Sequence, residues 1–165
     1  MHDGALRAGK TTLLRILAGL EKADSGQIEG LEGLRISMVF QEDRLCENLS
    51  ASANIRLVRG KKPWGRDKKL EAKISKAMAA VGLGGCQDQP VREFSGGMRQ
   101  RTALLRALYS EWDVLFLDEP FKGLDEETKE LVIEYTKKQC FGKTVIFVTH
   151  DRSEAGKMGG RLFKM

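Results

Sequence analysis

The first candidate for chemistry is a pattern of glycines, a lysine and a threonine near the start of the sequence. Gly4, Gly9, Lys10 and Thr11 satisfy the spacing G-x-x-x-x-G-K-[ST]. In such a loop the backbone amides surround a diphosphate, the lysine reaches the outer phosphates, and the threonine hydroxyl binds Mg²⁺. The spacing therefore predicts a phosphate-binding loop from Gly4 to Thr11, followed by a helix.

Two adjacent carboxylates form the second candidate. The stretch from Val114 to Leu117 is apolar without alternation, which predicts a strand buried on both faces. This strand would deliver Asp118 and Glu119 to the carboxyl end of a sheet, where open α/β folds place their ligands. An acidic pair at a strand end is more often merely solvated, so the pair gains weight only from the other motifs.

Polar residues also follow two further predicted strands. Residues 34–40 predict a strand that ends at Gln41, and residues 144–148 predict a buried strand that ends just before His150. Because the carboxyl ends of parallel strands share one edge, we expect His150 near the phosphate-binding lysine and the acidic pair. A lone histidine is usually structural, but this position favours a function.

A glycine turn opens a basic amphipathic helix in the middle of the chain. Ser95, Gly96 and Gly97 form a short linker whose backbone N–H groups can point at an anion. The helix that follows adds the positive end of its dipole. The turn is therefore a second candidate anion site.

The remaining elements place these motifs in an α/β fold. Strands that alternate with helices predict a mostly parallel sheet with right-handed crossovers. We expect one domain, with a core of residues 1–44 and 95–165 and a helical sub-lobe of residues 45–94. Asp125 can cap a helix. The further elements that we expect are helices at about 51–58, 70–81, 126–139 and 153–157, and strands at 27–29 and 161–165.

The composition is that of a globular protein, with 41% hydrophobic and 31% charged residues. No apolar run reaches about 18 residues, and the N-terminus lacks the apolar core of a signal peptide, so we expect a cytoplasmic chain. Cys46, Cys86 and Cys140 are far apart, which fits a reducing compartment and disfavours a disulfide framework or a zinc site. The net charge is +5, and the densest basic run, residues 59–69, is expected to be a solvated loop.

Taken in order, the motifs resemble those of the ATP-binding subunit of ABC transporters, from Gly9 to the end of the chain. The resemblance implies a P-loop NTPase fold with a RecA-like core, and the SGGMRQR form is similar to importer subunits for nitrate, sulfonate or taurine. The motifs that carry it are Gly9-Lys10-Thr11-Thr12, Val39-Phe40-Gln41-Glu42, Ser95-Gly96-Gly97-Met98-Arg99-Gln100-Arg101, Leu115-Phe116-Leu117-Asp118-Glu119-Pro120, Gly123-Leu124-Asp125 and Val148-Thr149-His150-Asp151.

The resemblance implies ATP and Mg²⁺ as cofactors. Lys10 would neutralise the β- and γ-phosphates, Thr11 would ligate the metal, and Thr12 would lie near the α-phosphate. Asp118 would hold the metal through water. Gln41 would touch the metal or the attacking water.

Catalysis and assembly are implied in the same way. Glu119 would polarise water for in-line attack, and His150 would contact the γ-phosphate. A second ATP-binding subunit, identical or different, would form a head-to-tail dimer in which Asp125 crosses the interface. Four residues would cap the nucleotide of that second subunit, namely Ser95, Gly96, Gly97 and Gln100. The helical sub-lobe and the Gln41 region would receive a membrane permease, so we expect a peripheral location on the inner face of the cell membrane and no nucleic-acid partner.

The front of the chain departs from the family pattern. Leu6 stands where the family usually has serine, and Arg7 where it usually has glycine, which costs energy if that position needs a positive φ. Because only Met1-His2-Asp3 precedes Gly4, the strand expected before such a loop is absent, and we expect a truncated fragment. Two alternatives stay open: a non-transport ABC ATPase that acts on DNA or ribosomes, and a non-hydrolysing remnant that only binds a partner.

Overall fold

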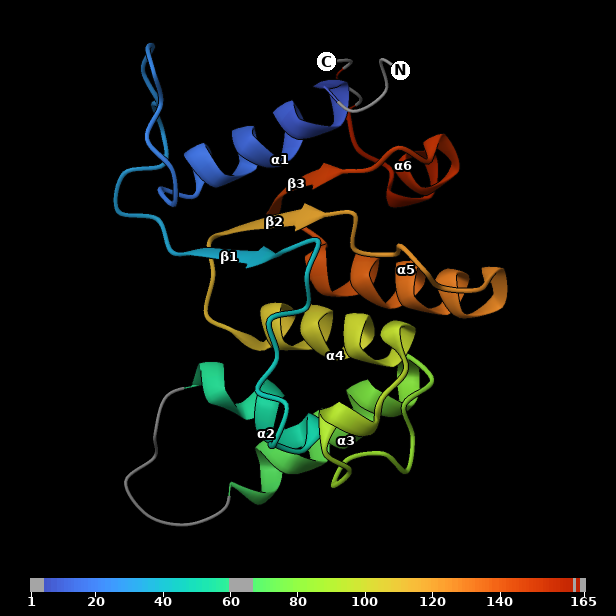
Figure 1. Ribbon diagram of the computed structural model, residues 1–165. Helices are drawn as coiled ribbons and strands as arrows, with labels where there is room; N and C mark the ends of the chain where they lie inside the picture. The colour runs from blue at the N-terminus through green and yellow to red at the C-terminus, as the bar shows by residue number, and fades with distance from the viewer. Residues whose placement is uncertain (1–4, 60–66, 162, 164–165) are drawn as a thin grey trace.

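The computed structural model describes residues 5–59, 67–161 and 163 (Figure 1). The described chain forms a parallel three-stranded sheet with helices on both faces, in the strand order β1-β2-β3. The elements in chain order are α1 (Ala5–Leu17), β1 (Ile36–Val39), α2 (Ala51–Arg56), the 3₁₀ turn η1 (Leu57–Arg59), α3 (Lys68–Ala80), the 3₁₀ turn η2 (Val91–Glu93), α4 (Gly96–Tyr109), β2 (Val114–Asp118), α5 (Glu126–Cys140), β3 (Thr144–Val148) and α6 (Arg152–Met158).

The middle strand, β2, is the most deeply buried element. All of its residues are buried, which confirms the expectation drawn from its apolar run. It pairs in parallel with β1 and with β3, where Val114 lies opposite Ile36 on one side and Thr144 on the other. Asp118 is carried into the interior as the last residue of this strand.

The two faces of β2 pack against different helices. Val114 and Phe116 face α1 and pack with its Leu14. Leu115 and Leu117 point to the opposite face, into the larger apolar cluster that α4 and α5 share. Figure 1 shows the resulting layers, with α1 on one side of the sheet and α4 and α5 on the other. This alternation is the period-2 geometry of a strand covered on both sides.

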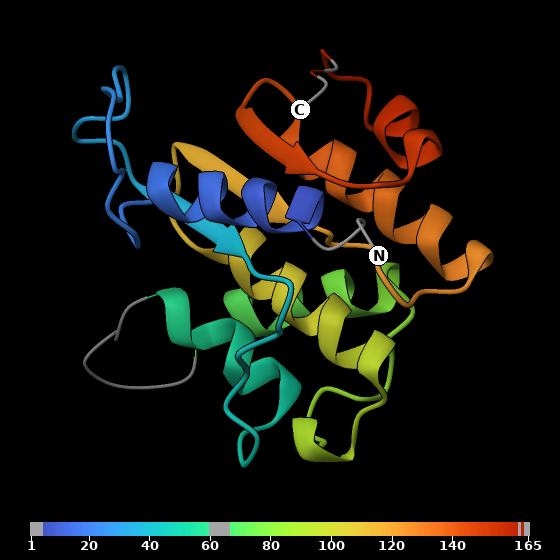
Figure 2. The same ribbon diagram turned by 45° about the horizontal axis from the view of Figure 1, so that its top comes forward.

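The helices between residues 51 and 80 lie beyond α4, on its far side from the sheet (Figures 1 and 2). Ile55 of α2 and Ile74 and Met78 of α3 are fully buried in the same apolar cluster as Leu104 of α4. A continuous core therefore joins this part to the sheet layer. The boundaries of the sub-lobe at residues 45 and 94 stay a prediction.

Three expectations about strands need correction. Residues 27–29 form no strand, and β3 is only partly buried because, among the described residues, it pairs on one side alone. Of the strand expected at 161–165, Arg161 and Phe163 are not in a strand, and the other residues lie outside the described part. Whether short segments such as these form buried strands depends on the strands beside them more than on their own composition.

The helices expected at 51–58, 70–81, 126–139 and 153–157 are found within two residues of those bounds, and Asp125 caps α5 as predicted, accepting a hydrogen bond from the Thr128 backbone N–H at 3.0 Å. The three cysteines are free. Most of the basic run at 59–69 lies outside the described residues.

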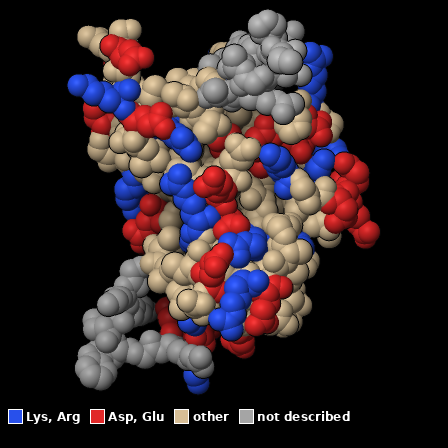
Figure 3. Space-filling model, in the orientation of Figure 1, with Lys and Arg blue, Asp and Glu red and all other residues tan. Residues whose placement is uncertain are grey.

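Within the described part of the chain, no helix is both long and apolar enough to cross a membrane. On the face shown in Figure 3, acidic and basic side chains are interspersed.

Candidate functional site

The carboxyl ends of the three parallel strands bring several predicted site residues to one edge of the sheet. Gln41 follows β1, Asp118 ends β2 with Glu119 directly after it, and His150 follows β3. The backbone N–H of Glu119 donates to the Val148 carbonyl at 2.9 Å, so β2 and β3 stay joined up to the acidic pair. The parallel arrangement thus confirms that these segments end together, as the sequence predicted.

Asp118 is the buried acid of the site. Its exposed fraction is 1%, and its Oδ2 accepts a hydrogen bond from the Thr11 hydroxyl at 2.8 Å. Its Oδ1 is buried without a hydrogen-bond partner among the described residues. Burial raises the pKa of Asp118, and the hydrogen bond from Thr11 opposes that rise. A buried carboxylate oxygen without a partner is costly, which indicates that a ligand completes this site.

The surroundings of Asp118 fit a magnesium ion. Thr11 and Gln41 line the same hollow, so a hydroxyl, an amide and a carboxylate gather there. Such oxygen groups are the ligands that Mg²⁺ prefers. A cation beside Asp118 would also offset the cost of burying its charge.

Glu119 and His150 form the second unit of the site. The His150 Nδ1 lies 2.8 Å from Oε1 and 2.7 Å from Oε2 of Glu119. The Glu119 side chain is 19% exposed and that of His150 is 66% exposed, so the pair lies at the rim rather than in the core. Glu119 has a positive φ of 51°, an uncommon backbone state for a residue with a side chain. Strain of this kind recurs at functional sites.

A hollow of about 900 Å³ connects the metal-binding candidates with the glycine turn. Asp118, Gly96 and Gly97 line it together with Thr11 and Gln41. Gly97 has little spare room, because a Cβ built on it would lie 3.2 Å from Leu124 Cδ2. The residues that line the hollow are Thr11, Arg15, Phe40, Gln41, Glu42, Asp43, Arg44, Leu45, Glu47, Gly96, Gly97, Arg99, Gln100, Asp118, Lys122 and Gly123.

The glycine turn is shaped by the residues on either side of it. Ser95 caps α4, and its hydroxyl accepts a hydrogen bond from the Met98 N–H at 3.3 Å. Gln100 is buried, and its side-chain amide donates to the Pro120 carbonyl at 3.2 Å and the Glu119 carbonyl at 3.4 Å. Gln100 therefore connects α4 by hydrogen bonds with the backbone at Glu119 and Pro120.

The phosphate-binding loop expected from Gly4 to Thr11 takes a different form. Helix α1 already begins at Ala5, so Gly9 and Lys10 lie within the helix, followed by Thr11 and Thr12. Gly4 lies outside the described residues. The physical reason is local, because Ala5-Leu6-Arg7-Ala8 is a run of strong helix formers where the family pattern has residues that favour a loop.

Two arginines and an aspartate near the hollow were missed by the sequence analysis. Arg99 contacts Asp43 through two hydrogen bonds, Nε to Oδ2 at 2.8 Å and Nη2 to Oδ1 at 3.0 Å. Arg106 donates to the carbonyls of Asp43 at 3.0 Å and Arg44 at 2.9 Å. These hydrogen bonds hold the segment after Gln41 against α4. In the sequence, this contact was indicated only by an acid two residues after Gln41 and by two arginines at helical spacing.

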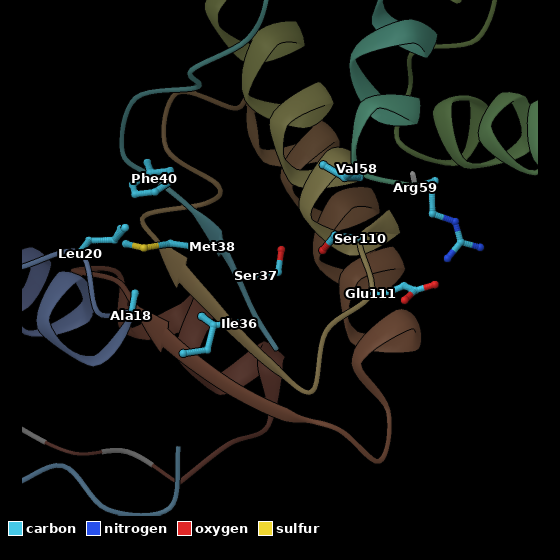
Figure 4. A pocket seen from close by; sticks show the side chains of 10 residues that line it. All are labelled: Ala18, Leu20, Ile36, Ser37, Met38, Phe40, Val58, Arg59, Ser110 and Glu111. Atoms are coloured by element: carbon cyan, nitrogen blue, oxygen red, sulfur yellow. The ribbon is translucent and has the colours of Figure 1, made fainter. Parts of the chain in front are cut away.

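A second hollow, of about 600 Å³, lies beside β1 and contains none of the predicted site residues (Figure 4). Its labelled side chains come from the segment just after α1, from β1 and the residue after it, from η1, and from the segment just after α4. They are Ala18, Leu20, Ile36, Ser37, Met38, Phe40, Val58, Arg59, Ser110 and Glu111.

Comparison with known families defines the class of this fold and site. The family model described as ABC transporter matches residues 4–122, which is more than half of the chain. The chain therefore belongs to the ABC transporter family. Two solved structures share its fold at 27% and 26% sequence identity, each covering 91% of this chain and 73% of the solved chain. They are the ATP-binding cassette MJ0796 as a post-hydrolysis dimer bound to ADP and Pi, with a TM-score of 0.76, and MJ0796 as a dimeric bacterial ABC transporter cassette, with a TM-score of 0.77.

Several curated relatives are named as import ATP-binding proteins. The sulfate/thiosulfate import ATP-binding protein CysA of Xanthomonas campestris pv. campestris is 37% identical over 174 residues, covering 96% of this chain and 50% of that protein. The aliphatic sulfonates import ATP-binding protein SsuB 1 of Pseudomonas savastanoi pv. phaseolicola is 37% identical over 166 residues, covering 98% and 66%. The chain thus spans about half the length of CysA and about two thirds of SsuB 1.

Proposed function

We propose that this chain binds and hydrolyses ATP and thereby drives import through an ABC transporter. The observation that carries the proposal is the pairing of a buried, incompletely satisfied Asp118 with the adjacent Glu119–His150 unit at one sheet edge. Relatives named as import ATP-binding proteins support the direction of transport. We place the chain, by the same support, on the inner face of a membrane.

Within this proposal, Asp118, Thr11 and Gln41 would hold Mg²⁺. The ion would supply charge neutralisation for the phosphates. Glu119 would orient and polarise a water molecule, while His150, bound to the same carboxylate, would reach the terminal phosphate from the adjacent strand. Lys10 and Thr12, in the middle of α1, would contact the phosphates.

Two further parts of the proposal concern partners. The glycine turn at Ser95–Gly97, with Gln100, would cap the ATP of a second subunit, and Asp125 would meet that subunit. The dimeric state of the MJ0796 structures supports this arrangement. A membrane permease would contact the sub-lobe and the segment after Gln41.

The test of the proposed function is a calorimetric titration with MgATP, joined to a turnover assay. Lys10→Ala should weaken binding tenfold or more, because the lysine charge on the phosphates is lost, whereas Lys138→Ala, at an exposed position of α5, should leave it unchanged. Glu119→Gln should keep binding and slow turnover by about 10²- to 10⁴-fold, since a positioned acid–base group contributes that much. Turnover at the parent rate in Glu119→Gln would refute its role. No binding by the parent chain would favour a remnant that acts only as a binding module.

A further inference from the structure

A nearly buried carboxylate lies behind the turn that carries His150. Glu154, on α6, is 4% exposed, and its Oε2 accepts a hydrogen bond of 2.6 Å from the Thr149 hydroxyl. A hydrogen bond to an ionised carboxylate at this distance belongs to the strong class. The function proposed above assigns nothing to this contact.

The Thr149 hydroxyl connects Glu154 with both sides of His150. While it donates to Glu154, it accepts a hydrogen bond from the Asp151 backbone N–H at 3.0 Å. Asp151 in turn caps α6 by accepting from the Ser153 N–H at 2.8 Å. The residues before and after His150 are therefore fixed through one hydroxyl, and the backbone between them has little freedom.

His150 depends on this support because its own side chain has little packing. The side chain is 66% exposed, and its Nδ1 lies 2.7 Å from the Glu119 carboxylate. An exposed ring keeps its direction mainly through its backbone and its hydrogen-bond partner. Movement of the 149–151 turn by about 1 Å would lengthen the contact with Glu119, and misplacements of that size can cost about 10²-fold in rate.

The charge of Glu154 is compensated by a lysine of the neighbouring helix. Lys129 Nζ, from α5, lies 3.6 Å from Glu154 Oε1, 3.6 Å from Asp151 Oδ2 and 2.9 Å from Glu126 Oε1. The lysine side chain is only 12% exposed. A buried carboxylate is tolerated when it is paired and hydrogen-bonded, and Glu154 has both kinds of partner.

We propose that Glu154 is a positioning residue for ATP hydrolysis, which holds His150 against Glu119 through the Thr149 hydroxyl and is itself neutralised by Lys129. The part of this inference that concerns ATP turnover rests on the proposed function.

Steady-state ATP turnover in three variants tests the kinetic part. Glu154→Ala and Thr149→Val each remove one end of the 2.6 Å hydrogen bond and should lower kcat about tenfold to a hundredfold, with KM for ATP within about twofold of the parent. Glu154→Gln keeps an oxygen that accepts from Thr149 and should retain most of kcat. Thr149→Val guards against the case in which Glu154→Ala fails to fold.

Glu130→Gln is the matched control. Glu130 pairs with Lys157 at 2.9 Å and so links the same two helices, α5 and α6, but at the exposed surface. It should leave kcat unchanged. If Glu130→Gln and Glu154→Ala lowered kcat equally, or if Thr149→Val had parent kcat, the positioning role would be overturned.

A measurement without nucleotide separates this inference from the proposed function. The chain has two histidines, so a His2→Asn background leaves His150 as the one histidine ring signal in NMR spectra. At fixed pH, Glu119→Gln defines the shift of that signal when the carboxylate charge is lost. Glu154→Ala and Thr149→Val should move the signal toward that position, and Glu130→Gln should not. If the signal is unmoved in both variants, the inference is overturned even when the parent hydrolyses ATP. If the parent shows no turnover, the proposed function is overturned, but the His150 signal still tests whether Glu154 holds His150 against Glu119.

Discussion

Carboxylates of the same chemical type behave differently in this protein because their surroundings differ. Asp118 is buried beside a hydroxyl, and its pKa is raised by burial. Asp113 lies at the surface beside Arg35, whose side-chain and backbone N–H groups lower the pKa of Asp113 to about 2. The first arrangement fits ligand binding, and the second contributes to stability at neutral pH.

The Asp113–Arg35 contact predicts a pH dependence of stability. Since the folded pKa of about 2 lies below the value of about 3.9 in an unfolded chain, the contact stabilises the fold above about pH 4 and is lost as the pH falls toward 2. Asp113→Asn should therefore flatten the fall of the unfolding free energy in this window, as measured by urea denaturation. Added salt should reduce the difference, because both side chains are exposed. An identical slope in parent and variant would contradict this prediction.

At the level of elements, helix starts depend on single side chains. In the described part of the chain, five helices begin after a residue whose side chain accepts a hydrogen bond from the first turn, namely Ser50, Asp67, Ser95, Asp125 and Asp151. Ser95 and Asp125 combine this role with a proposed role at the dimer interface. Each of these two residues thus stabilises the start of a helix and also lies at the proposed interface.

Asp67, the cap of α3, allows the cap to be tested away from the site. It accepts hydrogen bonds from the N–H groups of Lys69 at 3.1 Å and Leu70 at 3.2 Å. Asp67→Ala should lower the free energy of unfolding by about 1 kcal/mol, whereas Asp67→Asn should retain most of it, because asparagine is also a good cap. Thermal and urea unfolding followed by circular dichroism would measure both. Equal losses in the two variants would argue that charge, and not capping, is responsible.

At the level of the whole molecule, α4 joins the sheet layer to the outlying helices. Its Leu104 and Leu105 share one apolar cluster with Leu115 and Leu117 of β2. On its other side, Arg101 donates to the Val81 carbonyl after α3 at 2.8 Å. Burial opposes the ionisation of Asp43, but hydrogen bonds from Arg99 and Leu45 outweigh it, so the pKa of Asp43 is lowered. The segment after Gln41 and the start of α4 should therefore move together.

A double-mutant cycle of Asp43→Asn and Arg99→Met measures this connection. The coupling in unfolding free energy should be about 1 kcal/mol, since both side chains are largely shielded, at 20% and 22% exposure, and form two hydrogen bonds. The matched cycle of Arg35→Met and Glu111→Gln, an exposed pair at 57% and 67%, should give a coupling near zero. Equal couplings in the two cycles would show that shielding adds nothing at Asp43.

Much of the fold was predictable because it depends on patterns within single segments. The unbroken apolar run of Val114–Leu117 identified the central strand, and helical periodicity located α3 and α5 within a few residues. The same runs placed Asp118, Glu119 and His150 at the ends of parallel strands, so the order of motifs determined the class of site.

Only the tertiary structure determined the contacts between segments that are distant in sequence. Asp43 and Arg99 are 56 residues apart, and no local pattern pairs them. The partial exposure of β3 follows from which strands flank it, and the pairing of Lys129 with Glu154 follows from the packing of α5 beside α6. Periodicity and capping act over one or two turns and are written in the sequence, whereas partner choice among many charged side chains depends on how the elements pack in space.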